Sequence, residues 1–210
     1  MKNPEEIRAY FRSMPKKEKK NPYWEFDETL ELVQHLDGRH IHIGDNVPLL
    51  TQVRSYFRSV YESFGTETQV LCVTDDDKRI LEKKGIPNLG RYLFDGIPVW
   101  VMVLPQVNTP VNTIISETFW QKEIVDKGIM PVVRIHSHHR LDAYQSSTDY
   151  STLNSNTLEM VMGHINEDLF QVAYWLDQHG KDTKSHVFHV FQNFQGRFLM
   201  KQIACGNKET

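Results

Sequence analysis

Short apolar runs with the composition of β-strands recur along this chain, and they constrain its fold more than any other feature. The two clearest are Thr68 to Thr74 (TQVLCVT) and Val99 to Leu104 (VWVMVL). The first is a strand by composition, because β-branched and aromatic residues favour strands, and the second is an apolar run without alternation, which is typical of a buried strand. Further strands are expected at 40–43, 111–115, 131–138, 159–165, 171–176 and 186–192.

Helical patterns lie between these runs. Leu50, Val53, Phe57 and Phe64 recur at helical spacing, so residues 48–64 are expected to form an amphipathic helix that packs on a sheet and ends at Gly65. Shorter helices are expected at 77–84 and 116–127. Strands and helices alternate without a strict βαβ rhythm, so the predicted class is α+β, or mixed α/β.

The first 38 residues differ from the rest of the chain. Helices are expected at 4–12 and 28–36, the second capped by Asp27 and ended by Gly38, on either side of the basic run PKKEKK. A segment this short cannot bury a core of its own. The sequence therefore predicts an N-terminal helical extension over 1–38 and one domain over 39–205.

Charge and cysteine content exclude several classes of protein. The net charge is -3, whereas proteins that coat nucleic acid or bind membrane surfaces carry a basic excess. No apolar run approaches the roughly 20 residues of a membrane helix. Cys72 and Cys205 form neither a CxxC pair nor a disulfide framework. We expect a cytoplasmic protein that binds neither nucleic acid nor membrane.

The stretch RIHSHHRLDAYQSSTDY, residues 134–150, is where chemistry is expected. Strand side chains alternate, so His136 and His138 point to one face while Ser137 points away. A loop follows, and Asp149, in the first turn of the expected next helix, can add an oxygen ligand. Two imidazoles and one carboxylate leave a fourth tetrahedral position for water, which is the pattern of a catalytic zinc.

Such a site also needs a general base and a group that stabilises an oxyanion. Ser146 lies one helical turn before Asp149, so its hydroxyl is expected to face the same pocket. Glu67, at the start of the strand after the amphipathic helix, is the preferred base. Three other glutamates remain alternatives: Glu62, Glu117 and Glu123.

A structural interpretation of the same residues stands beside the functional one. Ser146 and Asp149 also have the spacing of a helix capping box, and two histidines can simply line an exposed strand. His40 and His42 show that a His-x-His pair alone is common, because no serine or aspartate follows them at the matching positions. The apolar residues around His136 favour an internal strand over an exposed one.

The full spacing, H-[ST]-H-x7-S-x2-D, resembles the JAMM (MPN+) motif of the Mov34/JAB metalloprotease family. The order of the expected elements is similar to that of the family: strand 40–43, helix 48–64, the strand beginning near Glu67, strand 99–104, helix 116–127 and strand 131–138. The resemblance implies a JAB/MPN-like, cytidine-deaminase-like domain over 39–205. Its central, mostly antiparallel curved sheet would be flanked by helices.

The resemblance also implies a role for each residue of the motif. His136, His138 and Asp149 would bind one Zn²⁺ per chain, Glu67 would take the proton of the attacking water, and Ser146 would stabilise the tetrahedral intermediate. The implied activity is hydrolysis of a peptide or isopeptide bond in a protein substrate, in some members after a ubiquitin-like or sulfur-carrier-like tail.

Two positions depart from the family pattern. His139 stands where the family usually has proline, and Gln69 and Val70 stand where glycine often follows the glutamate. Neither change removes a ligand. Two alternative functions remain: a non-catalytic MPN-type scaffold that binds a modifier or partner, and a hydrolase of small amides. Specificity is expected to lie in 75–96 and 105–115.

Overall fold

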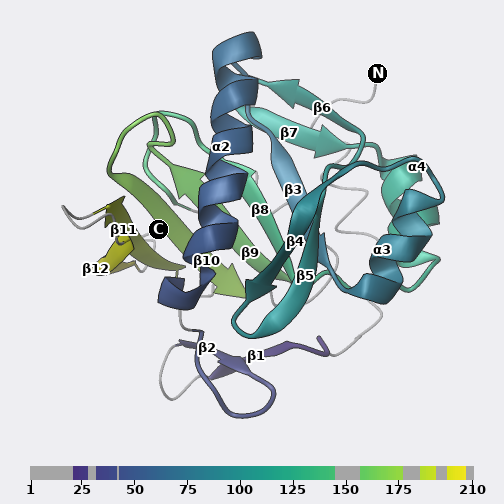
Figure 1. The fold of residues 1–210 in the computed structure, drawn as a ribbon, viewed down its shortest axis with the longest axis horizontal. Coiled ribbons are helices and arrows are strands. Elements are labelled where there is room, and N and C mark those ends of the chain that lie inside the picture. The colour runs from purple at the N-terminus through teal and green to yellow at the C-terminus, as the bar shows by residue number, and fades with distance from the viewer. Residues whose placement is uncertain are drawn as a thin grey trace.

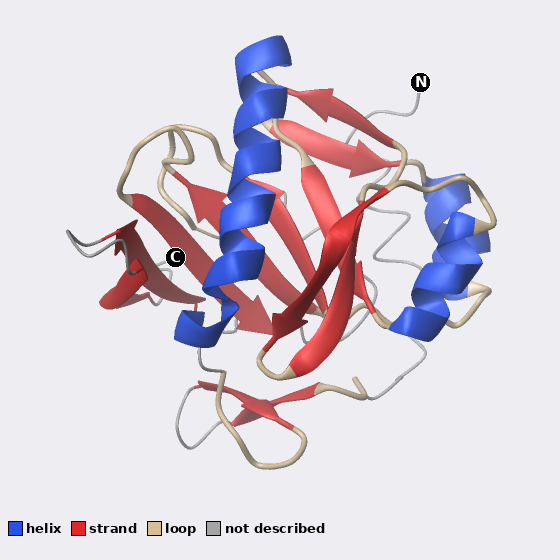
Figure 2. Cartoon of the chain, viewed as in Figure 1, coloured by secondary structure: helices blue, strands red, loops and turns tan. Residues whose placement is uncertain are grey.

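The fold was described from a computed structural model, which describes residues 21–27, 32–41, 43–144, 157–176, 185–192 and 198–206, the last two ranges by their backbone alone. An eight-stranded sheet forms its centre (Figures 1 and 2). Its strands, in spatial order, are β12 (Phe198–Gly206), β11 (Ser185–Gln192), β10 (Phe170–Leu176), β9 (Leu158–Gly163), β8 (Val133–Ser137), β3 (Gln69–Val73), β5 (Ile97–Met102) and β4 (Asn88–Phe94).

All neighbouring strands of this sheet are antiparallel except β8 and β9, which run parallel. A parallel pair needs a long crossover connection, and residues 138–157 supply it. The protein is therefore a mixed α+β protein with a mostly antiparallel central sheet, as the sequence predicted. The helix expected to begin near Ser146 falls in this crossover and lies outside the described residues.

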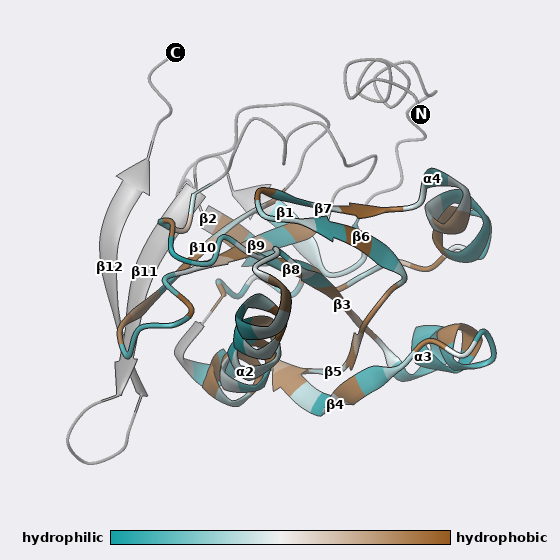
Figure 3. Cartoon of the chain, turned by 90° about the horizontal axis from the view of Figure 1, so that it is seen from above, coloured by the Kyte–Doolittle hydropathy of each residue, from teal (hydrophilic) through white to brown (hydrophobic). Residues whose placement is uncertain are grey.

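Helices pack on both faces of the sheet because its central strands are apolar on both faces. Val70 and Cys72 of β3 join the core that includes Leu50 and Phe57 of α2 (Val47–Phe64). The alternate residues of β3 join a second core with α3 (Asp75–Glu82) and the helical segment formed by α4 (Glu117–Phe119) and η2 (Trp120–Val125). Seen from above, α2 and α4 lie on opposite sides of β3 and β8 (Figure 3).

Most elements expected from residue 48 onwards are confirmed. Helix α2 ends at Gly65, whose backbone is left-handed (φ 66°), as the glycine signal predicted. The expected strands at 68–74, 99–104, 111–115, 131–138, 159–165, 171–176 and 186–192 correspond to β3, β5, β7 (Asn112–Ile115), β8, β9, β10 and β11. The sequence did not predict β4, β12, or β6 (Gln106–Thr109), which forms a hairpin with β7.

Two predictions near the N-terminus are wrong. The helix expected over 28–36 is replaced in its second half by β2 (Leu32–His35), which pairs with β1 (Trp24–Asp27). The strand expected over 40–43 is reduced to an isolated bridge at His40, followed by the 3-10 turn η1 (Ile43–Asn46). Residues 1–20 and 28–31 of the expected extension lie outside the described residues.

Tertiary packing explains why a hairpin forms here. Trp24 and Val33 are buried in the same core as α2 and the sheet. The Trp24 indole N–H donates to the backbone carbonyl of Val132 at 2.7 Å, and its ring packs edge-on against Phe94. These contacts depend on residues far away in the sequence, so local helix signals did not reveal them.

None of the described helices is long and apolar enough to span a membrane.

Candidate metal centre

The two histidines predicted as ligands lie together at the end of β8. This strand is internal, between β3 and β9, and every residue in it is buried. His136 and His138 are each 4% exposed, and their Nε2 atoms are 3.3 Å apart. Ser137 points away from them, and its hydroxyl accepts the backbone N–H of Thr68 at 3.1 Å. The predicted alternation along the strand is confirmed.

The contact between Nδ1 of His138 and a backbone carbonyl determines which nitrogen of this ring can act as a metal ligand. Nδ1 of His138 lies 3.3 Å from the backbone carbonyl oxygen of Asp142. A carbonyl only accepts, so this contact requires a proton on Nδ1, and in the neutral imidazole the lone pair is then on Nε2. Histidines that bind metals usually have this arrangement, with the second nitrogen oriented by a carbonyl or carboxylate.

The spacing of the two nitrogens fits a metal site. Zinc binds histidine nitrogen at about 2.0–2.1 Å in tetrahedral geometry, so two such ligands lie roughly 3.3–3.4 Å apart. The observed 3.3 Å between Nε2 of His136 and Nε2 of His138 agrees with that value. A direct hydrogen bond from His136 to the lone pair of His138 has a similar length. The distance therefore fits both a zinc site and a hydrogen-bonded pair of structural histidines. Metal binding is the property that distinguishes the two.

Glu67 lies two residues before Gln69, the first residue of β3, which is the strand next to β8. Gln69 faces His136 across the β3–β8 pair, and Ser137 N donates to Thr68 O at 3.0 Å. Continuing this antiparallel register by two residues places Glu67 opposite His138, on the same face of the sheet. Glu67 is only 5% exposed.

The three alternative glutamates lie elsewhere. Glu62 is exposed on α2 and pairs with Arg58, while Glu117 belongs to α4 and Glu123 of η2 pairs with Lys84. Glu67 is the glutamate of the four that the strand register brings to the histidines.

Ser146 and Asp149 lie outside the described residues, so the structure describes three of the five predicted site residues and shows His136 and His138 in contact. Within the described ranges, no group of three or more histidine, cysteine, aspartate or glutamate side chains is arranged to hold a metal ion. The described part of the candidate centre thus consists of the two imidazoles, with Glu67 opposite His138 by strand register.

His139 occupies the turn that leaves β8, and it is buried. Its φ is 45°, a left-handed conformation, and its ring stacks on Tyr61 of α2 with centroids 4.4 Å apart. Nε2 donates to the carbonyl of Pro110 at 3.2 Å. Desolvation lowers the pKa of His139, and the bond to Pro110 offsets this only in part. A neutral His139 therefore connects the end of β8 to α2 and to the β6–β7 turn.

Other residues around the histidines were not predicted. Tyr144 packs edge-on against His138 with ring centroids 4.9 Å apart, and Asp142 contributes its backbone carbonyl. Gly163, at the end of β9, lies against the loop that carries them. The one signal in the sequence was a glycine inside an apolar strand, which often marks a close approach of another backbone segment.

No protein-family model matches this chain, and no curated protein matches it.

Proposed function

We propose that this chain is a zinc-dependent metallopeptidase of the JAMM type, with a JAB/MPN-like fold, that hydrolyses a peptide or isopeptide bond. The observation that carries the proposal is the pair of Nε2 atoms 3.3 Å apart, one of them on a ring whose Nδ1 faces the Asp142 carbonyl. His136 and His138 would hold the metal together with Asp149. A bound Zn²⁺ would supply Lewis acidity, acidifying a water molecule and polarising the substrate carbonyl.

The residues of the chain would then perform the proton transfers. Glu67, opposite His138, would accept a proton from the attacking water and deliver it to the leaving amine as the C–N bond breaks. The Ser146 hydroxyl would donate to the oxyanion. Burial of Glu67 and of both histidines supports this role, because water-excluded sites strengthen electrostatic interactions.

The β6–β7 hairpin is the expected contact for the substrate. Glu67 N donates to Thr109 O at 2.8 Å, so the hairpin is joined directly to the site. The Gln106 side chain bonds both the N–H and the carbonyl of Gln69, each at 3.0 Å. Val107, 67% exposed, pairs across the hairpin with Ile114. An extended, partly apolar protein tail would fit such a surface through strand addition.

The test combines metal analysis with cleavage assays. Purified protein is expected to carry about one zinc per chain, as a single mononuclear site implies. His138→Ala should abolish both zinc binding and hydrolysis of ubiquitin-like fusions or peptide libraries read by mass spectrometry. His40→Ala is the matched control, because it removes a histidine from the other His-x-His pair and should change neither.

Glu67→Gln separates the enzyme from the scaffold. This variant should retain zinc and lose turnover. Wild-type protein that binds zinc and a ubiquitin-like partner but cleaves no substrate would favour the non-catalytic scaffold. Full hydrolytic activity in metal-free protein would contradict the proposal.

A further inference from the structure

The loop that follows His138 folds back against the end of β9. His138 N donates to Met162 O at 2.8 Å, Ile165 N donates to His139 O at 2.8 Å, and His164 N donates to Leu141 O at 3.1 Å. These backbone bonds join residues 138–141 to residues 162–165, so the loop is held along its length. The carbonyl of Asp142, which orients His138, belongs to this loop.

Gly163 lies where the loop comes closest. A Cβ at this position would be 2.5 Å from Ala143 N and 2.7 Å from the Asp142 carbonyl carbon, and closer still to Leu141 O. Real Cβ atoms essentially never approach other atoms so closely. The φ of Gly163 is not positive, unlike that of six other glycines in the described chain. Space, rather than backbone conformation, is therefore what requires glycine here.

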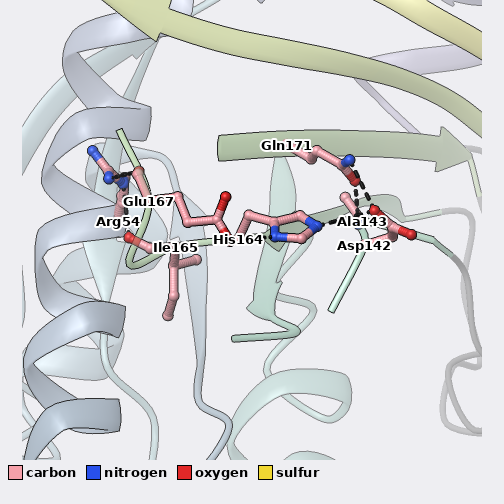
Figure 4. A network of polar contacts seen from close by, with 7 residues as sticks. All are labelled: Arg54, Asp142, Ala143, His164, Ile165, Glu167 and Gln171. Carbon is pink, nitrogen blue, oxygen red and sulfur yellow. Dashed lines mark hydrogen bonds and ion pairs between the residues drawn. The ribbon is translucent and has the colours of Figure 1, made fainter. Parts of the chain in front are cut away.

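Side chains of the β9–β10 region hold the same loop from its outer side (Figure 4). His164 Nε2 lies 3.0 Å from Asp142 Oδ1, and its Nδ1 lies 2.9 Å from Glu167 Oε1. Gln171 donates to Asp142 Oδ1 and accepts from Ala143 N, both at 2.9 Å.

The turn that carries His164 is itself attached to α2. Arg54 donates to the carbonyls of Ile165 and Glu167. The loop position is thus fixed from the helix, the turn and strand β10 together.

We propose that Gly163 is a positioning residue for the metal centre. Its missing side chain lets residues 141–143 close onto β9, and this brings the Asp142 carbonyl to Nδ1 of His138. The proposal rests on the proposed function, because it gives the oriented imidazole the role of a metal ligand. A Cβ at 163 would push the loop outward, weaken the Nδ1–carbonyl bond and leave the proton of His138 free to move to Nε2.

The test measures zinc affinity by competition with a chromophoric chelator in Gly163→Ala and in the wild type. Loss of the partner that orients a metal-binding histidine costs about 10–100-fold in affinity, so a loss of that size is expected. The control is Gly128→Ala, which strains a left-handed glycine (φ 70°) with open space around it, before β8 begins. This variant should lose stability and keep its zinc affinity.

A second readout does not depend on zinc. The ¹⁵N chemical shifts of His138 in metal-free protein report which ring nitrogen carries the proton, and Gly163→Ala should shift them toward the Nε2–H form. If wild-type protein binds no zinc, the proposed function fails, whereas these shifts still test the positioning role.

His164→Asn covers the case in which Gly163→Ala does not fold. It removes one anchor of Asp142 while keeping a residue that tolerates the left-handed backbone of His164 (φ 52°). Its effects should have the same direction and be smaller. Folded Gly163→Ala protein with wild-type zinc affinity and unchanged His138 shifts would overturn the proposal. If only His164→Asn folds, unchanged values in that variant would do the same.

Discussion

Arg134 of β8 and Glu159 of β9 form a buried ion pair, with Nε 2.7 Å from Oε2, at directly opposed positions of the parallel strands. Strands β8 and β9 are the one parallel pair of strands in the described sheet. They flank the crossover that contains Ser146 and Asp149. The ion pair therefore ties β9, and with it Gly163, to the strand that carries both histidines.

Removing one partner of this pair should be costly. Glu159→Gln removes the carboxylate that faces the Arg134 charge in a buried site, and breaking a buried pair in this way destabilises by about 3–5 kcal/mol. Urea unfolding followed by circular dichroism would measure the loss. The double variant Arg134→Met/Glu159→Leu should recover much of it, because neither charge is then buried. A single variant as stable as the wild type would show that the pair does not contribute to folding.

The Trp24 indole should also contribute measurably to stability. Trp24→Phe keeps an aromatic ring in the core but leaves the Val132 carbonyl without its 2.7 Å donor. A buried acceptor that loses its partner costs about 1–3 kcal/mol, and the smaller ring adds a cavity penalty. Chemical unfolding is the measurement. Tyr23→Phe, at the neighbouring half-buried position, is the control: it removes a hydroxyl hydrogen bond to Thr74 without opening a cavity and should have a smaller effect.

An element or a site residue could be predicted from the sequence where its signal is local, and could not where it depends on residues far away in the chain. The α2 pattern and the β3 and β8 runs are local, and each predicted its element; the spacing within α2 also predicted the face that it buries. The position of Glu67 opposite His138 follows from the β3–β8 register. The sequence showed only that Glu67 lies near the start of a strand. The β1–β2 hairpin depends on Trp24 meeting Val132 and Phe94, which no local pattern encodes. Gly163 and Asp142 interact only after the chain has crossed from β8 to β9.

Cys72 should be unreactive in the folded protein. It lies fully buried in the core, and desolvation raises the pKa of its thiol far above the ordinary value of 9.0. Since the thiolate is the nucleophile, iodoacetamide should modify Cys72 only after unfolding. Peptide mapping by mass spectrometry distinguishes Cys72 from Cys205. Rapid labelling of Cys72 in native protein would show that this part of the core opens.

Metal removal should lower stability if the proposed function holds. A ligand at 100 times its Kd adds about 2.7 kcal/mol to the free energy of unfolding. For a protein of this size that corresponds to a Tm change of roughly 5–10 °C. Thermal unfolding with zinc, and again after chelation, should show this difference in the wild type and in His40→Ala. His136→Ala should show none, and a wild type that is equally indifferent to zinc would argue against a cation site.

Stability near the loop should depend on pH through His164. Desolvation lowers the pKa of His164, but hydrogen bonds and charge interactions with Glu167 and Asp142 together raise it above the ordinary 6.5. Both ring nitrogens face carboxylates, which only accept, so both contacts form only when the imidazole is protonated. A raised pKa in the folded state means that this contribution is complete below about pH 6.5, the unfolded value, and disappears as the pH rises through the folded value. The nearby Arg54 acts on the backbone carbonyls of the turn and keeps its charge throughout. We therefore expect the Tm difference between the wild type and His164→Asn to be largest near pH 6 and to shrink toward pH 9. A difference that grows with pH would show that His164 holds the loop as a neutral side chain.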